Sequence, residues 1–185
     1  MIDSTAPISF NLGRFVNTYQ FSDSETIQAL IDTIRAEAVR GQRPSNVQAL
    51  VTWNLYNIDH NAQPQDRFFT FLKTSLEHSW SNLLCDNKGS ESVNFRISSM
   101  WGAIYQPGDW ADYHTHGPSR TSWVYYLQAD PTQGAPLVFD NTGYEIMPTT
   151  GQLIMFPSWL GHSVPKFMPK DASERIVLAG NVEIQ

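Results

Sequence analysis

The histidines of this chain have the spacing that most clearly indicates chemistry. His114 and His116 are one residue apart, at the end of a segment rich in turn residues and just ahead of a β-rich run. In an extended segment the side chains alternate faces with a period of two, so both imidazoles should point the same way. Two imidazoles on one face can bind the same metal ion from two directions.

A third ligand is expected, because a catalytic metal centre usually takes three protein ligands and leaves positions open for substrate. The chain has only five histidines, and His162 follows His114 by 48 residues (162 − 114 = 48) in another strand-like run. We therefore predict a metal site of His114, His116 and His162. Asp140 is an alternative ligand. Asp112 precedes His114, which is the wrong side for the usual order of histidine followed by acid.

Neutral imidazoles suit iron, zinc, copper and nickel. In the common non-haem iron triad the second ligand of the short motif is a carboxylate, and here it is His116. This difference removes one negative charge from the ligand set. A bound dianionic co-substrate would then matter more for neutralising Fe(II).

Arg175 is the second informative residue, 13 positions after His162 (175 − 162 = 13) in a strand-like run. A guanidinium deep in a β-sandwich needs an anionic partner, because an unpaired buried charge is severely penalised. Its fork of N–H groups matches a carboxylate. A hydroxyl alongside, such as that of Tyr126, would complete a pocket for the far end of a dicarboxylate.

Two helices are predicted in the N-terminal half. Ser22 and Glu25 fit a capping box, and the apolar period that follows predicts a helix over residues 23–40, with Arg40 as its C-terminal cation. A second helix should begin near residues 64–66. Its apolar face is wide, which indicates that it lies against a sheet, and this face could also be shared with a partner in a homo-oligomer.

The rest of the chain has the pattern of β-structure. One or two short strands are expected over residues 6–21 and another around 47–55. From residue 93 onward no helix is expected, and turn residues separate β-rich runs over 93–105, 122–128, 137–139, 152–156, 162–165 and 175–184. We therefore predict one mainly β (α+β) domain over residues 1–185, with helical and strand support over 1–90 and a metal-binding β-core over 91–185.

Composition narrows the functional classes. With 185 residues, 41% of them hydrophobic, the chain is long enough to bury a core. A net charge of −6 argues against nucleic acid as a partner. The N-terminus lacks the features of a signal peptide and there is no long apolar run, so we expect a cytoplasmic protein without a membrane span. Cys85, the one cysteine, is expected to be a small buried apolar group.

From about Ile97 to Val182 the sequence resembles the iron- and 2-oxoglutarate-dependent dioxygenases of the prolyl-hydroxylase-like superfamily. It is most similar to the small putative 2-oxoglutarate/Fe(II) oxygenases with an H-x-H motif. The resemblance depends on H-T-H-G-P, W-V-Y-Y-L, L-V-F-D, G-Q-L-I-M-F-P-S-W-L-G-H-S-V and R-I-V-L-A-G-N. The run from Gly151 to Val164, with Arg175 at its offset, is the specific part.

The resemblance implies a double-stranded β-helix, the jelly roll or cupin-like fold, with His114 and His162 as iron ligands and His116 where relatives usually have aspartate. It implies that Arg175 pairs with the distal carboxylate of 2-oxoglutarate. It also implies that Tyr126 touches the same group and that Tyr105 lines the co-substrate pocket.

The activity that this resemblance implies uses Fe(II), O2 and 2-oxoglutarate, releases succinate and CO2, and hydroxylates a peptide side chain or a small molecule. Trp110, in the loop ahead of the first two histidines, is the best candidate for contacting substrate. Two alternatives stay open. One is a cupin-type three-histidine metalloenzyme that does not use 2-oxoglutarate, although cupins usually have a glutamate soon after H-x-H and none occurs here before Glu145. The other is a binding module without activity.

Overall fold

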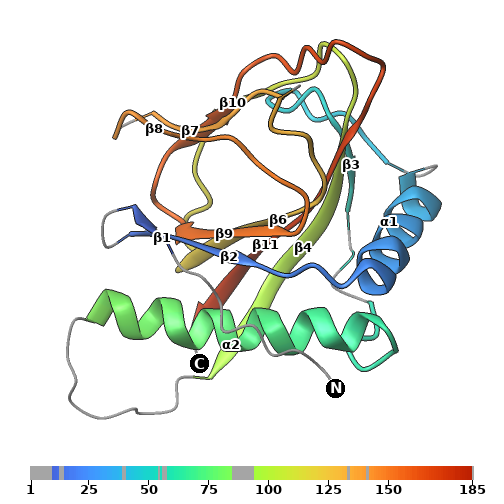
Figure 1. Ribbon diagram of the computed structural model, residues 1–185. Helices are drawn as coiled ribbons and strands as arrows, with labels where there is room; N and C mark the ends of the chain where they lie inside the picture. Colours follow the sequence, from blue (N-terminus) through green and yellow to red (C-terminus); the bar gives the residue numbers. More distant parts are fainter. Residues whose placement is uncertain are drawn as a thin grey trace.

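The computed structural model of the protein describes residues 10–12, 15–38, 41–53, 55, 58–84, 94–132, 134–140 and 142–184. Two antiparallel β-sheets face each other, and two helices cover the outer face of the larger sheet (Figure 1). This arrangement confirms the predicted mainly β class with helices from the N-terminal half.

The larger sheet has seven strands in the order β1-β2-β9-β6-β11-β4-β3. All neighbours in it are antiparallel. The strands are β1 (Phe10–Leu12), β2 (Val16–Gln20), β3 (Leu50–Thr52), β4 (Phe95–Tyr105), β6 (Thr121–Gln128), β9 (Gln152–Pro157) and β11 (Arg175–Ile184).

The smaller sheet has four strands in the order β5-β10-β7-β8, and its neighbours are also antiparallel. Its strands are β5 (Ala111–His114), β7 (Leu137–Phe139), β8 (Tyr144–Ile146) and β10 (His162–Val164). β5 and β8 were not predicted. Both are short and flanked by turn residues, and each depends on a neighbour distant in the sequence or on a short hairpin for its hydrogen bonds.

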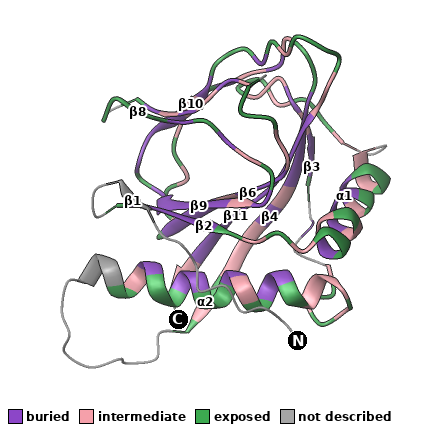
Figure 2. Ribbon diagram, in the orientation of Figure 1, coloured by how far each residue is buried: buried purple, intermediate pink, exposed green. Residues whose placement is uncertain are grey.

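The helices α1 (Ser24–Ala38) and α2 (Gln65–Leu84) bury their apolar faces against the large sheet. Figure 2 shows the buried residues of both helices turned toward the strands. In α2 the buried side chains include Phe68, Leu72 and Leu76, which join one core cluster with residues from β4, β6, β9 and β11. The expected contact between the second helix and a sheet is therefore confirmed.

The inner face of the large sheet contributes to a second core cluster. Because side chains alternate along a strand, Tyr105, Tyr126 and Val177 point to this side while their neighbours in sequence point to the helices. Leu137 and Val164 come from the facing small sheet. β11 is buried on both faces from Arg175 to Val182, which explains its nearly continuous apolar sequence.

The start of α1 differs from the prediction. Asp23, not Ser22, accepts the hydrogen bonds of the first turn, from the backbone N–H of Glu25 (3.3 Å) and the hydroxyl of Thr26 (2.9 Å). Aspartate satisfies these N-terminal donors well, so the N-cap is one residue later than predicted. Arg40 and Cys85 lie outside the described residues.

Among the described residues, no helix has both the length and the apolar character needed to cross a membrane.

Candidate metal centre

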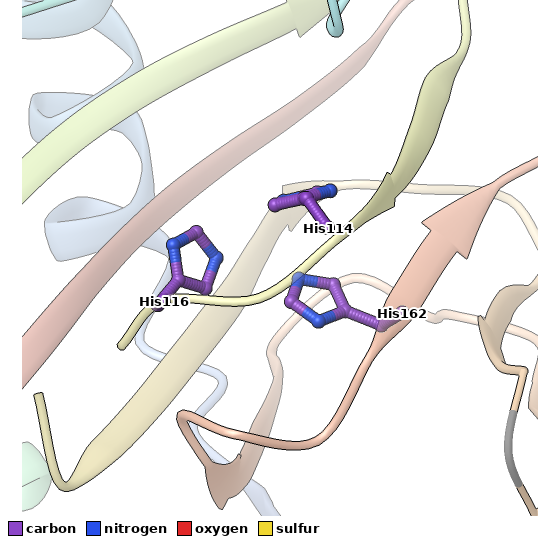
Figure 3. A group of neighbouring side chains, drawn as sticks. All are labelled: His114, His116 and His162. Atoms are coloured by element: carbon purple, nitrogen blue, oxygen red, sulfur yellow. The ribbon is translucent and has the colours of Figure 1, made fainter. Parts of the chain in front are cut away.

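Strands β5 and β10 bring two histidines face to face. His114 ends β5, His162 begins β10, and they are Cα partners in the antiparallel ladder. Their ring centroids are 4.3 Å apart. His116 lies in the loop just after β5, and its ring is 4.9 Å from that of His114 and 5.1 Å from that of His162 (Figure 3). The pairing of β5 with β10, together with the short loop after β5, thus brings three imidazoles close together.

His116 is held by the backbone, not by strand pairing. Its N–H donates to the carbonyl oxygen of Ser158 at 2.8 Å, which ties the loop after β5 to the turn between β9 and β10. His114 and His116 therefore point toward the same place, as expected. They do not share one strand, however, because β5 ends at His114.

One candidate ligand atom from each histidine lies within 4.8 Å of the others. Three nitrogens that bind one ion at about 2.1 Å in tetrahedral geometry lie about 3.4 Å apart, so metal binding would draw these atoms together by up to about 1.4 Å. His114, His116 and His162 form the one such group among the described residues. Asp140 is exposed and instead accepts a hydrogen bond from Ser163 at 3.1 Å, outside this group.

Backbone carbonyls set the orientation of two rings. Nδ1 of His114 lies 2.7 Å from the carbonyl oxygen of Asp112, and Nδ1 of His162 lies 3.1 Å from that of Leu160. A carbonyl oxygen can only accept, so each Nδ1 carries the proton. Each Nε2 then keeps a free lone pair for a metal ion.

Burial keeps two rings neutral. It lowers the pKa of His162 to about 3 and that of His116 to about 4, with a smaller contribution from the neighbouring His114 in each case. Because a metal ion binds neutral imidazole, neither ring has to lose a proton at neutral pH before it can act as a ligand.

Arg175 is buried at the other end of the same cavity, opposite Tyr105 in the β4–β11 ladder. Its side chain is 2% exposed, and Nη2 donates to the carbonyl oxygen of Ala135 at 2.6 Å. Nε and Nη1 are buried and have no hydrogen-bond partner among the described residues. Burial lowers the pKa of this guanidinium from its usual value. Nε and Nη1 face opposite sides of the guanidinium, so a carboxylate can accept from one of these orphaned donors together with the second N–H of Nη2.

Two tyrosines line the cavity near this guanidinium. Tyr126 has its ring centroid 6.0 Å from the Arg175 guanidinium carbon, and Tyr105 is the ladder partner of Arg175. Burial raises the pKa of Tyr126 to about 12 and raises the pKa of Tyr105 as well. Both phenols are therefore neutral at physiological pH and able to donate a hydrogen bond.

A cavity of about 340 Å³ between the two sheets joins the histidines to the arginine end. Trp110 is not among its lining residues and contributes instead to a separate, open depression beside Asp112 and Asp140. The tryptophans that line the cavity are Trp53, Trp101 and Trp123. A substrate contact at Trp110 stays a prediction, and the position of Trp110 outside the cavity argues against it.

Sequence reasoning gave no site role to Trp53, Trp101 or Asn181, which all line the cavity. A signal for Trp101 was present: it is four residues before Tyr105, so the period of two puts both on the same face of β4. Trp53 follows a strand of only three residues, and nothing in its local sequence indicates the cavity.

No protein-family model matches the chain, and no curated protein does. Solved structures do match. A viral collagen prolyl hydroxylase from Paramecium Bursaria Chlorella virus-1, in complex with 2OG, superposes with a TM-score of 0.65 at 18% identity, covering 92% of this chain and 96% of the other. A prolyl-4-hydroxylase from Pseudomonas putida gives 0.64 at 19% identity, covering 92% of both chains.

An oxidoreductase of the 2OG-Fe(II) oxygenase family from Burkholderia pseudomallei gives a TM-score of 0.59 at 15% identity, covering 91% of this chain and 84% of the other. The chain has the fold of the 2-oxoglutarate/Fe(II) oxygenases. The fold implied by the motifs in the second half of the sequence is thereby confirmed over nearly the whole chain.

Proposed function

We propose that the protein is an Fe(II)- and 2-oxoglutarate-dependent dioxygenase that hydroxylates a peptide side chain or a small molecule. The observation that carries this proposal is the Arg175 guanidinium. It is buried, with two donors unpartnered among the described residues, in the cavity onto which three histidines converge. Such a cation is costly to bury alone, and an anionic co-substrate offsets that cost.

The three histidines, Arg175 and Tyr126 then have the following roles. His114, His116 and His162 hold Fe(II) through Nε2 or an equivalent ring nitrogen. Arg175 would bind the distal carboxylate of 2-oxoglutarate through one of its orphaned N–H groups and the second N–H of Nη2, and Tyr126 would donate to the same carboxylate. Bound Fe(II) would supply the chemistry by which O2 oxidises the substrate while 2-oxoglutarate is converted to succinate and CO2.

Charge balance supports this pairing of cofactor and co-substrate. Three neutral imidazoles leave the charge of Fe(II) at +2, and Arg175 adds +1. The −2 charge of 2-oxoglutarate lowers this sum from +3 to +1, which suits a cavity between two sheets better than the uncompensated charge does. No carboxylate joins the ligand group among the described residues, so a dianion is the natural source of the compensating charge.

A three-histidine metalloenzyme that does not use 2-oxoglutarate is the second candidate, and the all-histidine ligand group favours it. That candidate gives no role to the orphaned donors of Arg175, and for this reason we rank it lower. A non-enzymatic module that binds 2-oxoglutarate without turnover is the third candidate.

The deciding experiment is anaerobic titration of the protein with Fe(II) and 2-oxoglutarate. We expect the visible charge-transfer band of the bidentate chelate, lost in Arg175→Ala and His162→Ala. Arg35→Ala is the matched control, since Arg35 is half-exposed and ion-paired with Glu174 on the surface. Admission of O2 should then give succinate.

The other outcomes separate the alternatives. Metal-dependent turnover that is indifferent to 2-oxoglutarate would favour the cupin-type enzyme. A charge-transfer band without succinate under any substrate condition would favour the binding module. If neither band nor succinate is seen, the dioxygenase proposal is wrong.

A further inference from the structure

The β4–β11 ladder shows that the cavity has two ends. Residues of the two strands that line it are paired Arg175 with Tyr105, Val177 with Ala103, Ala179 with Trp101, and Asn181 with Ser99. Six residues of strand at about 3.3 Å each place the Cα atoms of Arg175 and Asn181 about 20 Å apart. The five-carbon chain of 2-oxoglutarate spans only about 6 Å. A co-substrate at the arginine end therefore leaves the other end open for a second ligand.

The end near Asn181 lies past the histidines as seen from Arg175. The ring of His116 is 5.5 Å from that of Trp101, whose ladder partner is two residues before Asn181. Trp53 stands 6.2 Å from Trp101 and is 49% exposed, so the pair leads from solvent to the metal site. We call Trp53, Trp101 and Asn181 the amide subsite.

The charge distribution along the cavity is uneven. Of the described residues that line it, Arg175 alone has a charged side chain. The polar side chains next to Asn181 are neutral: they are Ser99 and Ser122. A cationic group brought to this end would lose its hydration without gaining an ion-pair partner, which is strongly unfavourable.

The Asn181 amide is fixed in one orientation. Its Oδ1 accepts from the hydroxyl of Ser122 at 2.8 Å, and its Nδ2 donates to the hydroxyl of Ser99 at 2.9 Å. The hydroxyls of Ser122 and Ser158 are in turn 2.8 Å apart. An amide nitrogen has two N–H groups, so one remains for a ligand carbonyl or hydroxyl. The register of the β4–β11 pairing shifts between Asn181 and Val182.

We propose that the amide subsite binds an uncharged, flat-faced group of the substrate, a ring or a planar amide, and excludes ammonium and guanidinium groups. The indole of Trp101 supplies a face for stacking, and Asn181 supplies a donor and an acceptor. A cation could also lie over an indole, but no carboxylate lines the cavity among the described residues and the neighbouring metal ion repels it. That this group belongs to a substrate rests on the proposed dioxygenase function, whereas the charge preference does not.

Two matched probes test this preference: benzamide and benzamidine share one flat ring and differ in charge. Binding is measured by ligand-observed NMR on protein loaded with Zn(II) and 2-oxoglutarate, so no turnover is needed. We expect benzamide to bind at least about tenfold more tightly than benzamidine. Trp101→Ala should lose this binding, while Trp159→Phe should keep it, because Trp159 is 62% exposed and lies outside the cavity lining.

Asn181→Asp supplies the sharpest variant, since it keeps the shape of the side chain and adds one negative charge. It should reverse the preference toward benzamidine. Equal or tighter binding of benzamidine to the unaltered protein, or no saturable binding of benzamide, would overturn the proposal. The same panel on Arg175→Met, which removes the one charged lining residue and the 2-oxoglutarate end, keeps this test separate from the dioxygenase proposal. If the protein fails to bind 2-oxoglutarate, the dioxygenase proposal is wrong, and the benzamide measurement still decides the charge preference of the amide subsite.

Discussion

The guanidinium of Arg175 lies directly against Gly134. A Cβ placed on Gly134 would be 2.2 Å from Nη2, the atom that donates to the carbonyl oxygen of Ala135. Gly134→Ala should therefore displace the guanidinium and raise KM for 2-oxoglutarate by about tenfold, equivalent to about 1.4 kcal/mol, with a smaller effect on kcat. Pro131→Ala, at an exposed position of the same loop, is the control. An unchanged KM would show that Arg175 adjusts without cost.

Arg175 itself should lower the stability of the ligand-free protein. It is 2% exposed and has two donors without partners among the described residues, so an apolar side chain of similar length should be tolerated better. We expect Arg175→Met to raise the free energy of unfolding in urea by about 1–4 kcal/mol. The same change should abolish the rise in Tm that 2-oxoglutarate produces with the metal-loaded protein. Arg35→Met, at a surface ion pair, should change stability by less than about 0.5 kcal/mol.

Tyr126 and Tyr125 are neighbours in β6 that point to opposite faces, and this makes them a matched pair. Tyr126 lines the cavity, whereas the Tyr125 hydroxyl donates to the carbonyl oxygen of Phe21 on the helix side. A hydrogen bond to a charged group contributes about 1.5–3 kcal/mol, so Tyr126→Phe should weaken 2-oxoglutarate binding by about tenfold or more. Tyr125→Phe should lower Tm and leave that affinity unchanged. Equal affinities in both variants would remove Tyr126 from the co-substrate pocket.

His116 occupies the position at which a carboxylate is usual, so its role as a ligand has to be measured. His116→Ala should weaken Fe(II) or Zn(II) binding by at least about tenfold, because one of three ligands is lost. Asp140→Ala should leave metal affinity unchanged, since Asp140 is exposed and bonded to Ser163. Isothermal titration calorimetry of both variants distinguishes the two ligands. Loss of metal binding in Asp140→Ala would mean that the site rearranges to recruit the acid.

The convergence of the three histidines could be predicted from sequence because its parts are local or occur in ordered motifs. The two-residue spacing of His114 and His116 and the offset from His162 to Arg175 are properties of the chain itself. Helix α2 was predictable as well, since a wide apolar face has to be buried somewhere.

The substrate end could not be predicted in the same way. Trp110 is close to the histidines in sequence, yet β5 directs it to the outer side, while Trp53 reaches the cavity from a strand about 60 residues earlier than His114. Asn181 gains its significance from the strand register that places it opposite Ser99. Such relations depend on pairing between distant strands, which local sequence does not encode.

The burial of His162 predicts how the metal-free protein responds to acid. The ring is 5% exposed, and burial lowers its pKa to about 3, whereas an unfolded chain has a histidine pKa of about 6.5. Between these values the unfolded state binds more protons than the folded state, so the free energy of unfolding falls as pH falls below about 6.5. From pH 6.5 to pH 5 this ring should account for a loss of about 2 kcal/mol. Urea unfolding with EDTA at several pH values measures the slope. His162→Gln should reduce it, and an identical slope in that variant would show that the ring is hydrated in solution.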